Sequence, residues 1–218
     1  IANTSYDASV VVDEQHKYLV GIKSFGLESG DQKIAQFKKD SQSWNELLSE
    51  IRFHAAISPD KETADKENKT RYEKLAREIA SLRNQRIESS KALIKGFHSD
   101  SSHVEAVYHV LMPTSKGHKP QIHVGETTYL PVDLDNLKIL GSTTKNNPTN
   151  FRFTDGHHDY KYTAADSQLH MTFRNKEIVV DTWDVNYVED PFYLFEHLHL
   201  LTSEKSDSEI LEMVSWVI

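Results

Sequence analysis

Residues 6–37 constrain the fold more than any other part of the chain, because two short apolar runs flank a polar turn there. Residues 8–12 are mostly β-branched and residues 18–25 are mostly apolar, a pattern that predicts two paired strands. Asp7 opens the first strand, and Lys23 lies near the end of the second, sixteen residues further on. We therefore expect both side chains at the same end of neighbouring strands.

Lys23 follows a run of apolar residues and a glycine, where an unpaired ammonium is costly, so it needs an anionic partner. Hydrolysis of a phosphodiester requires an oxygen ligand for Mg²⁺ and a cation near the attacking water or the developing charge. In this hypothesis Asp7 is the metal ligand and Lys23 the catalytic cation. The alternative is an ordinary hairpin in which Lys23 reaches solvent or pairs with Asp7 only structurally.

Residues 32–51 have the apolar spacing of a helix, and Asp31 suits the N-cap position before them. Gln32 and Gln36 are four residues apart and share one face of this predicted helix. The segment therefore predicts two strands followed by a helix.

Several short motifs in this region resemble the PD-(D/E)XK nuclease superfamily, and type II restriction endonucleases in particular. They are YDA around Asp7, GIK at residues 21–23, and VGIKSFG followed by DQKIAQF. In that superfamily an aspartate begins one strand and an acid-X-lysine triplet ends the next. The resemblance covers about the first fifty residues. It implies a mixed central sheet flanked by helices, Mg²⁺ as cofactor, catalytic roles for Asp7 and Lys23, and a supporting catalytic role for Gln32.

Gly21 departs from the superfamily pattern, because it stands where the second acid is expected. Two interpretations stay open. In one, another element supplies the second carboxylate; we assign Glu28 to the metal beside Asp7, and the other sources are Asp31, Glu46 or a residue upstream of Ile1. In the other, the core is degenerate and binds DNA without cutting it. Because the chain begins without an initiator Met, we expect an upstream piece to be missing.

Length and composition set the outer bounds. A chain of 218 residues can bury a full core, and both helical and strand signals predict an α/β (α+β) fold. The absence of cysteine excludes disulfides, thiolate zinc sites and cysteine nucleophiles. Twelve histidines occur without a recognised metal-ligand spacing. No apolar run of eighteen residues and no signal-peptide pattern occurs, so we expect a soluble, cytoplasmic protein without membrane contact.

The net charge of −8 argues against nucleic acid at face value, but the charge is unevenly distributed. Residues 69–98 hold eight Lys or Arg against three Glu, whereas residues 189–212 hold seven acids against one Lys. The basic segment is a candidate phosphate-binding surface. A solvated helix face is the commoner explanation of such a run.

The rest of the chain predicts a helical hairpin followed by a β-rich lobe. Residues 58–68 separate the two helices, and residues 70–97 form a long amphipathic helix. From residue 103 the apolar period changes to that of strands, with two hairpins predicted at residues 151–154/160–163 and 169–173/178–183. Residues 141–150 are predicted to be a linker, and two helices are predicted at the end of the chain, at residues 192–201 and 206–217. We interpret the organisation as 1–56 catalytic core, 57–100 helical arm and 101–218 recognition lobe.

Two functions remain. The first is a Mg²⁺-dependent endodeoxyribonuclease similar to type II restriction enzymes, acting on double-stranded DNA as a homodimer, since two symmetry-related centres cut both strands most simply. The second is a non-catalytic DNA-binding or assembly module on the same core. In either case we assign DNA contact to residue types that reach phosphates or base edges: Lys33, Gln36, Asn150, Arg152 and Lys161.

Overall fold

The structure is a computed structural model in which residues 6–13, 16–95, 103–114 and 117–185 are described. The chain divides into two compact units, Ile1–Trp183 and Asp184–Ile218, and only residues 184 and 185 of the second are described. The helices predicted at residues 192–201 and 206–217 lie outside the described residues. Within the described ranges, no helix has the length and apolar character needed to cross a membrane.

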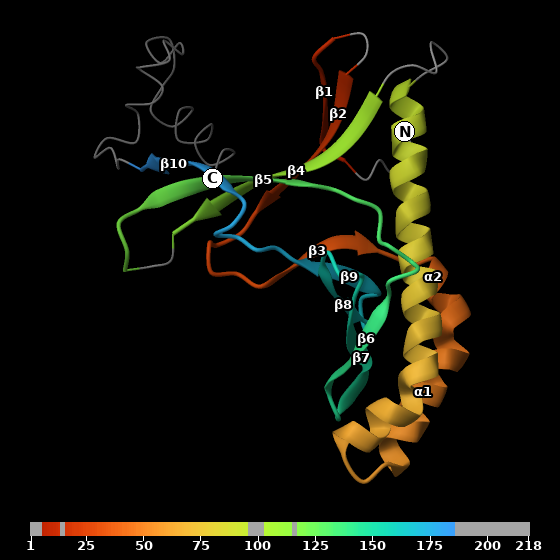
Figure 1. Ribbon diagram of the computed structural model, residues 1–218. Helices are drawn as coiled ribbons and strands as arrows, with labels where there is room; N and C mark the ends of the chain where they lie inside the picture. The colour runs from red at the N-terminus through yellow and green to blue at the C-terminus, as the bar shows by residue number, and fades with distance from the viewer. Residues whose placement is uncertain (1–5, 14–15, 96–102, 115–116, 186–218) are drawn as a thin grey trace, which may run out of the picture. The chain divides into compact units, whose positions relative to one another are not determined.

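Five strands form the first sheet, hereafter sheet 1 (Figure 1). Their order is β1 (Ala8–Val11), β2 (His16–Ser24), β4 (His103–Pro113), β5 (Gln121–Thr128) and β10 (Val179–Asp184). β1 and β2 are antiparallel, so the predicted first hairpin is confirmed. β2 and β4 are parallel over nine residue pairs, which places a strand from residue 103 onward directly beside Lys23.

A second sheet of five strands, hereafter sheet 2, is joined only by antiparallel pairs (Figure 1). Its order is β3 (Asp31–Gln36), β9 (Gln168–Thr172), β8 (Asp159–Thr163), β7 (Asn147–Thr154) and β6 (Lys138–Thr144). The predicted hairpin at residues 151–154/160–163 is confirmed as β7 and β8. β3, from the first fifty residues, therefore completes a sheet built mainly from residues 138–172.

The helix predicted at residues 32–51 is wrong in its first half. Residues 31–36 form strand β3, a 3₁₀ helix follows at Asp40–Trp44, and helix α1 spans Asn45–Ile57. Asp31 is accordingly no N-cap, and Gln32 and Gln36 share no helical face. The sequence spacing fits a helix, but pairing of β3 with β9, about 140 residues away along the chain, overrides the local preference.

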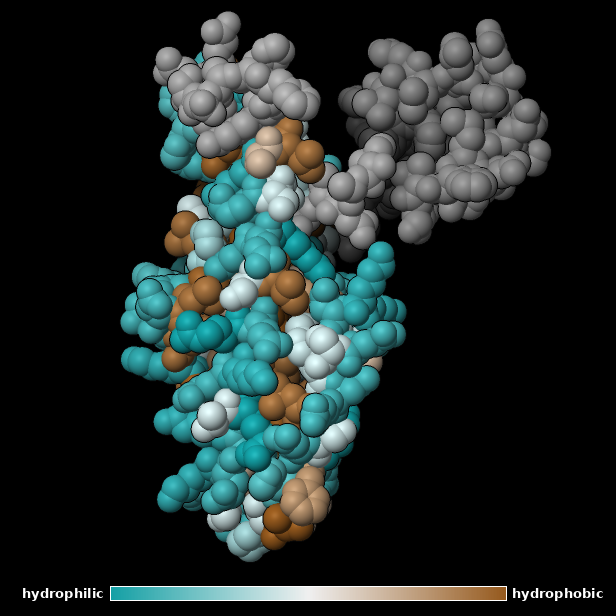
Figure 2. All heavy atoms as spheres, turned by 90° about the vertical axis from the view of Figure 1, so that its right-hand side faces the viewer, coloured by the Kyte–Doolittle hydropathy of each residue, from teal (hydrophilic) through white to brown (hydrophobic). Residues whose placement is uncertain are grey.

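Helix α2 (Lys61–Lys95) packs one face against the sheets and leaves the other to solvent. Its buried residues recur at helical spacing and include Tyr72, Leu75, Ala76, Ile79, Ala80, Arg83 and Ile87. Tyr72 stacks on Phe151 of the inner face of sheet 2, whose other buried side chains include Phe153, Tyr160, Tyr162, Leu169 and Met171. Further along α2, Arg83 instead lies over the ring of Tyr129, which follows β5. Figure 2 shows the side on which α1 and α2 lie, and this surface is largely hydrophilic.

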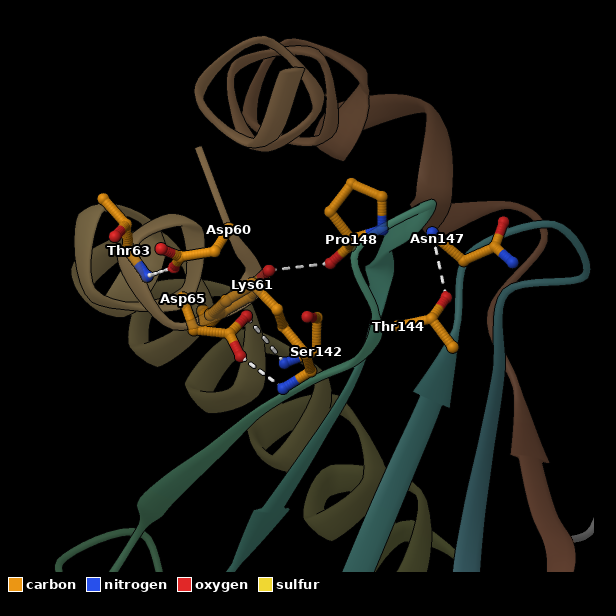
Figure 3. Close-up of polar contacts among 9 residues, drawn as sticks. Asp60, Lys61, Thr63, Asp65, Ser142, Thr144, Asn147 and Pro148 are labelled. Atoms are coloured by element: carbon orange, nitrogen blue, oxygen red, sulfur yellow. Dashed lines mark hydrogen bonds and ion pairs between the residues drawn. The ribbon is translucent and has the colours of Figure 1, made fainter. Parts of the chain in front are cut away.

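Polar contacts fix the start of α2 to the β6–β7 hairpin (Figure 3). Asp65 accepts a hydrogen bond from the Ser142 backbone N–H at 2.9 Å and pairs with Lys61 at 2.6 Å. Two turns further on, the Tyr72 hydroxyl donates to the Pro148 carbonyl at 2.8 Å. Since α2 holds the inner face of sheet 2 in this way, the opposite face stays clear of both helices.

Two further expectations differ from the structure. Residues 141–150 are not a linker, because most of them belong to strands β6 and β7. Residues 169–173 and 178–183 do not form a hairpin: β9 pairs with β8 and β3, whereas β10 joins β5 in the other sheet. A turn at residues 174–178 thus links the two sheets, which sequence alternation alone does not distinguish from a hairpin turn.

The mixed α+β class is confirmed, and so is a pair of consecutive helices, α1 and α2. The predicted separator at residues 58–68 is wrong in most of its length, because α2 begins at Lys61. The strands form two five-stranded sheets. Strands of residues 1–56 pair with strands of residues 101–172 in both sheets. The restriction-endonuclease-like arrangement remains a proposal.

Candidate nucleic-acid interface

Asp7 and Lys23 lie close enough to interact electrostatically. Asp7 Oδ2 accepts a hydrogen bond from the Ile22 backbone N–H at 2.7 Å, which fixes the carboxylate against β2. Burial lowers the pKa of Lys23, and the Asp7 carboxylate opposes that shift. These two described side chains form no direct ion pair; the Lys23 ammonium instead lies 5.9 Å from the centre of the Tyr108 ring.

The neighbour of Gly21 on β4 leaves no space for a side chain at residue 21. Gly21 and Tyr108 are partners in the parallel ladder, and a Cβ atom at residue 21 would lie 2.9 Å from Tyr108 Cδ1. The Tyr108 side chain is buried and its ring contacts the ring of Tyr129 with centres 4.1 Å apart. An aspartate or glutamate at residue 21 therefore has no space in this packing.

The other acids considered for the metal do not gather around Asp7. Glu28 pairs with Lys176 at 3.0 Å on the surface, Glu46 is exposed in the first turn of α1, and Asp31 belongs to sheet 2. Among the described residues, no three His, Cys, Asp or Glu side chains come together in a way suited to a metal ion. The described side chains thus do not fit the two-carboxylate Mg²⁺ site that the resemblance implies.

Of the three predicted amide side chains, two form hydrogen bonds within the fold and the third faces the helices. Gln32 alternates with Asp31 and Lys33 along β3 and pairs with buried Met171, so it faces the helix side of sheet 2. Gln36 donates to the Asp166 carbonyl at 3.0 Å. Asn150 Oδ1 accepts from the Ala164 backbone N–H at 2.9 Å. The last two contacts hold the turn between β8 and β9.

The three predicted basic contacts do come together, on the face of sheet 2 that the helices leave clear. Lys33 on β3 is opposite His170 on β9, His170 is opposite Lys161 on β8, and Lys161 is opposite Arg152 on β7. Opposed residues share a face of a sheet, so these four side chains form one line across four strands. We call this line the basic row and the face that carries it the outer face.

Asp31 is the acid inside this group. Its carboxylate pairs with Lys161 at 2.9 Å, forms a two-pronged ion pair with Arg152, and accepts the Thr172 hydroxyl at 2.7 Å. Burial would raise the pKa of Asp31, but the hydrogen bonds from Lys161, Thr172 and Arg152 outweigh it and lower the pKa to about 2. One ionised carboxylate thus orders two cations and leaves an excess of positive charge on the basic row.

His170 lies in the middle of the basic row. Burial lowers its pKa, and Lys161, Lys33 and Arg152 lower it further, while Asp31 opposes the shift. Its Nε2 atom is buried and has no hydrogen-bond partner among the described residues. His170 is therefore neutral near pH 7 and sits where an approaching anion changes its proton affinity.

In the basic segment of α2, four of the eight cations form ion pairs within the fold. Ion pairs join its cations to acids of α1, of the 3₁₀ helix and of α2 itself; they are Arg71–Glu50, Arg86–Asp40, Lys69–Glu73 and Lys91–Glu88. Arg83 is buried, with its guanidinium 3.7 Å from the centre of the Tyr129 ring. For the described part of residues 69–98, this pairing favours the solvated helix face over a phosphate-binding surface.

Sequence reasoning missed His170, Thr172 and the role of Asp31. A signal for the first two exists, because Leu169 and Met171 alternate with them and mark the opposite face as apolar. The sequence holds no comparable signal for Asp31, whose partners come from strands more than 120 residues away along the chain.

Comparisons of the chain with protein-family models, curated proteins and solved structures found no match. Any functional assignment consequently rests on the geometry of the outer face and of the Asp7–Lys23 pair.

Proposed function

We propose that this protein binds double-stranded DNA through the outer face of sheet 2. The observation that carries the proposal is the basic row: Lys33, His170, Lys161 and Arg152 occupy directly opposed positions on four neighbouring strands. Lys and Arg are among the side chains that contact phosphate oxygens in protein–DNA complexes. The rigid sheet holds them in a fixed line.

The dimensions of the row suit a nucleic-acid backbone. Neighbouring strands lie about 4.8 Å apart, so the row spans about 14 Å. Duplex DNA carries one negative charge for about every 1.7 Å of axis, and several phosphates therefore face a row of this length. Contacts of this kind position DNA and carry no sequence information by themselves.

The basic row is a small region of positive charge in a protein whose net charge is −8. Asp31 neutralises part of Lys161 and Arg152, whereas Lys33 is exposed and adds an unshared positive charge. The acidic remainder repels DNA at long range, and this restricts binding to the row. Phosphate contacts with the cations of the row make that binding weaker as the salt concentration rises.

Binding is tested with a fluorescently labelled duplex whose anisotropy is followed at several salt concentrations. Lys33→Gln is expected to weaken binding several-fold and to reduce the slope of log K against log salt by about 1. Lys38→Gln is the matched control, because Lys38 is also exposed but lies beyond the end of β3. Absence of salt-dependent binding by the unchanged protein would overturn the proposal.

Divalent-ion-dependent DNA cleavage is the second candidate function. The coupling of Asp7 and Lys23 favours it, because it is the pair that the resemblance to PD-(D/E)XK nucleases requires. Gly21 disfavours cleavage, because it stands where the second acid is expected and the Tyr108 ring leaves no space for a larger side chain there. In this function the protein acts as a homodimer, with one centre for each DNA strand.

Cleavage is tested separately from binding, with supercoiled plasmid and Mg²⁺ or Mn²⁺. Nicking or linearisation that disappears in Lys23→Ala, while duplex binding persists, would support the nuclease. Binding without cleavage over the same ions would support the non-catalytic DNA-binding module.

A further inference from the structure

A pocket of about 270 Å³ opens beside the basic row, between sheet 2 and the turn that leads to β10. Its floor is apolar, with Met171, Phe173 and Ile178, and its rim is polar. The rim includes His157 and His158 from the turn between β7 and β8, Asp159 at the start of β8, and Arg174 and Glu177 from the turn after β9. Arg174 and Glu177 form an ion pair at 3.7 Å. An apolar floor with a few polar groups at the edge is typical of a site for a small ligand.

The pocket lies close to the basic row, on which the phosphates are proposed to bind. Thr172 lines it and follows His170 of the basic row by two residues on β9, a distance of about 7 Å along a strand. The Thr172 hydroxyl donates to Asp31, the acid that orders Lys161 and Arg152. Thr172 and its bond to Asp31 therefore connect the pocket to the basic row.

The histidine side of the pocket is held in place before any ligand arrives. Asp155 is buried and its Oδ1 accepts the backbone N–H groups of His157 at 3.0 Å and His158 at 2.8 Å. The Tyr160 hydroxyl donates to the same carboxylate at 3.2 Å. These bonds fix the turn, and the pocket depends on no rearrangement of it.

His158 offers an unused hydrogen-bonding group. Its Nδ1 atom is buried without a partner among the described residues. Burial also lowers the pKa of His158, which keeps the ring neutral near pH 7. A neutral imidazole has one donor and one acceptor, the combination that the edge of a nucleobase complements.

We propose that this pocket receives a single nucleobase, unstacked from the DNA strand whose phosphates lie on the basic row. The volume suits one planar heterocycle and is below the usual range for drug-sized ligands. The apolar floor contacts the base, and the histidine rim pairs with its edge. This inference rests on the proposed DNA binding and adds to it a class of ligand for the pocket.

The test uses duplexes in which 2-aminopurine replaces adenine at one position at a time. Its emission rises several-fold when the base leaves the stack, so one position is expected to brighten on addition of the unchanged protein. His157→Ala and His158→Leu are expected to reduce that rise while anisotropy still reports binding. His118→Ala, an exposed histidine outside the pocket, is the matched control.

The outcomes separate the two proposals. Duplex binding without brightening at any position would overturn the pocket assignment and leave DNA binding intact. Brightening that is equal in His157→Ala and in the unchanged protein would also overturn it; His157 is exposed, so this variant tests the idea even where His158→Leu fails to fold. Absence of binding in both assays would remove DNA binding itself.

Discussion

The ring of Tyr108 lies against the backbone of Gly21, so that a Cβ atom at residue 21 would come within 2.9 Å of Tyr108 Cδ1. Residues 21 and 108 are partners across the parallel β2–β4 pair, and Tyr108 is buried among other aromatic rings. The glycine of the GIK triplet consequently has a packing reason that is independent of catalysis.

Gly21→Ala is expected to destabilise the fold by roughly 1–3 kcal/mol, because a well-packed ring has to move to admit the new methyl group. Urea unfolding measures the change. Gly30→Ala is the matched control, since nothing lies within 4 Å of a Cβ there, and it is expected to be nearly neutral.

A double variant tests whether the Tyr108 ring causes the loss of stability expected for Gly21→Ala. Gly21→Ala combined with Tyr108→Leu is expected to cost less than the sum of the single changes, because removing the ring removes the clash. Strict additivity would contradict this account. So would a Gly21→Asp variant that folds as stably as the unchanged protein.

The first hairpin was predictable because its signal is local: two short apolar runs flank a polar turn. β3 was not, because residues 31–36 suit a helix as well as a strand, and the choice is made by β9, about 140 residues away along the chain. The two sheets could not be separated by sequence either, since β9 and β10 have the alternation of a hairpin but join different sheets.

Only part of the candidate site could be predicted from the sequence, for the same reason. Lys33, Arg152 and Lys161 were chosen for their residue type, and the sequence does not say that they align. Their alignment depends on the registers of three strand pairs, which long-range packing sets. Asp31 was assigned to a helix start because Asp is frequent there, whereas its buried ion pairs require the folded sheet.

Acid is expected to destabilise the protein through Asp31. Its pKa falls from 3.8 to about 2 on folding, so its contribution is complete above about pH 4 and is lost as the pH falls towards 2. Asp31→Asn is expected to cost about 1–3 kcal/mol near neutral pH, because Lys161 and Arg152 lose their anion. Its stability should also depend less on pH between about 4 and 2, which thermal melts at a series of pH values measure.

Asp135→Asn is the control for the acid experiment, because Asp135 is exposed. It is expected to leave both the neutral stability and the acid transition nearly unchanged. A variant lacking Asp31 that unfolds over the same acid range as the unchanged protein would show that another carboxylate governs the transition.

The pKa of Lys23 is expected to fall further when Asp7 is neutralised. Burial lowers this pKa below 10.5 and the Asp7 carboxylate raises it, so Asp7→Asn removes the one favourable influence. NMR titration of ¹³C-methylated lysine measures the shift directly. Between the lowered pKa and 10.5 the unfolded chain binds more protons at this residue, so its contribution to stability rises with pH. An unchanged Lys23 titration in Asp7→Asn would show that the two side chains are not coupled.

DNA binding is expected to strengthen as the pH falls, through His170. Three cations and burial lower its pKa in the free protein, and phosphates on the basic row reverse part of that effect. Binding then takes up a proton, and affinity rises below about pH 6.5. His170→Gln is expected to reduce the difference in duplex affinity between about pH 5.5 and pH 7.5, measured by anisotropy at constant salt, whereas His118→Gln retains it. An equal pH dependence in His170→Gln and in the unchanged protein would mean that the phosphates do not approach the centre of the row.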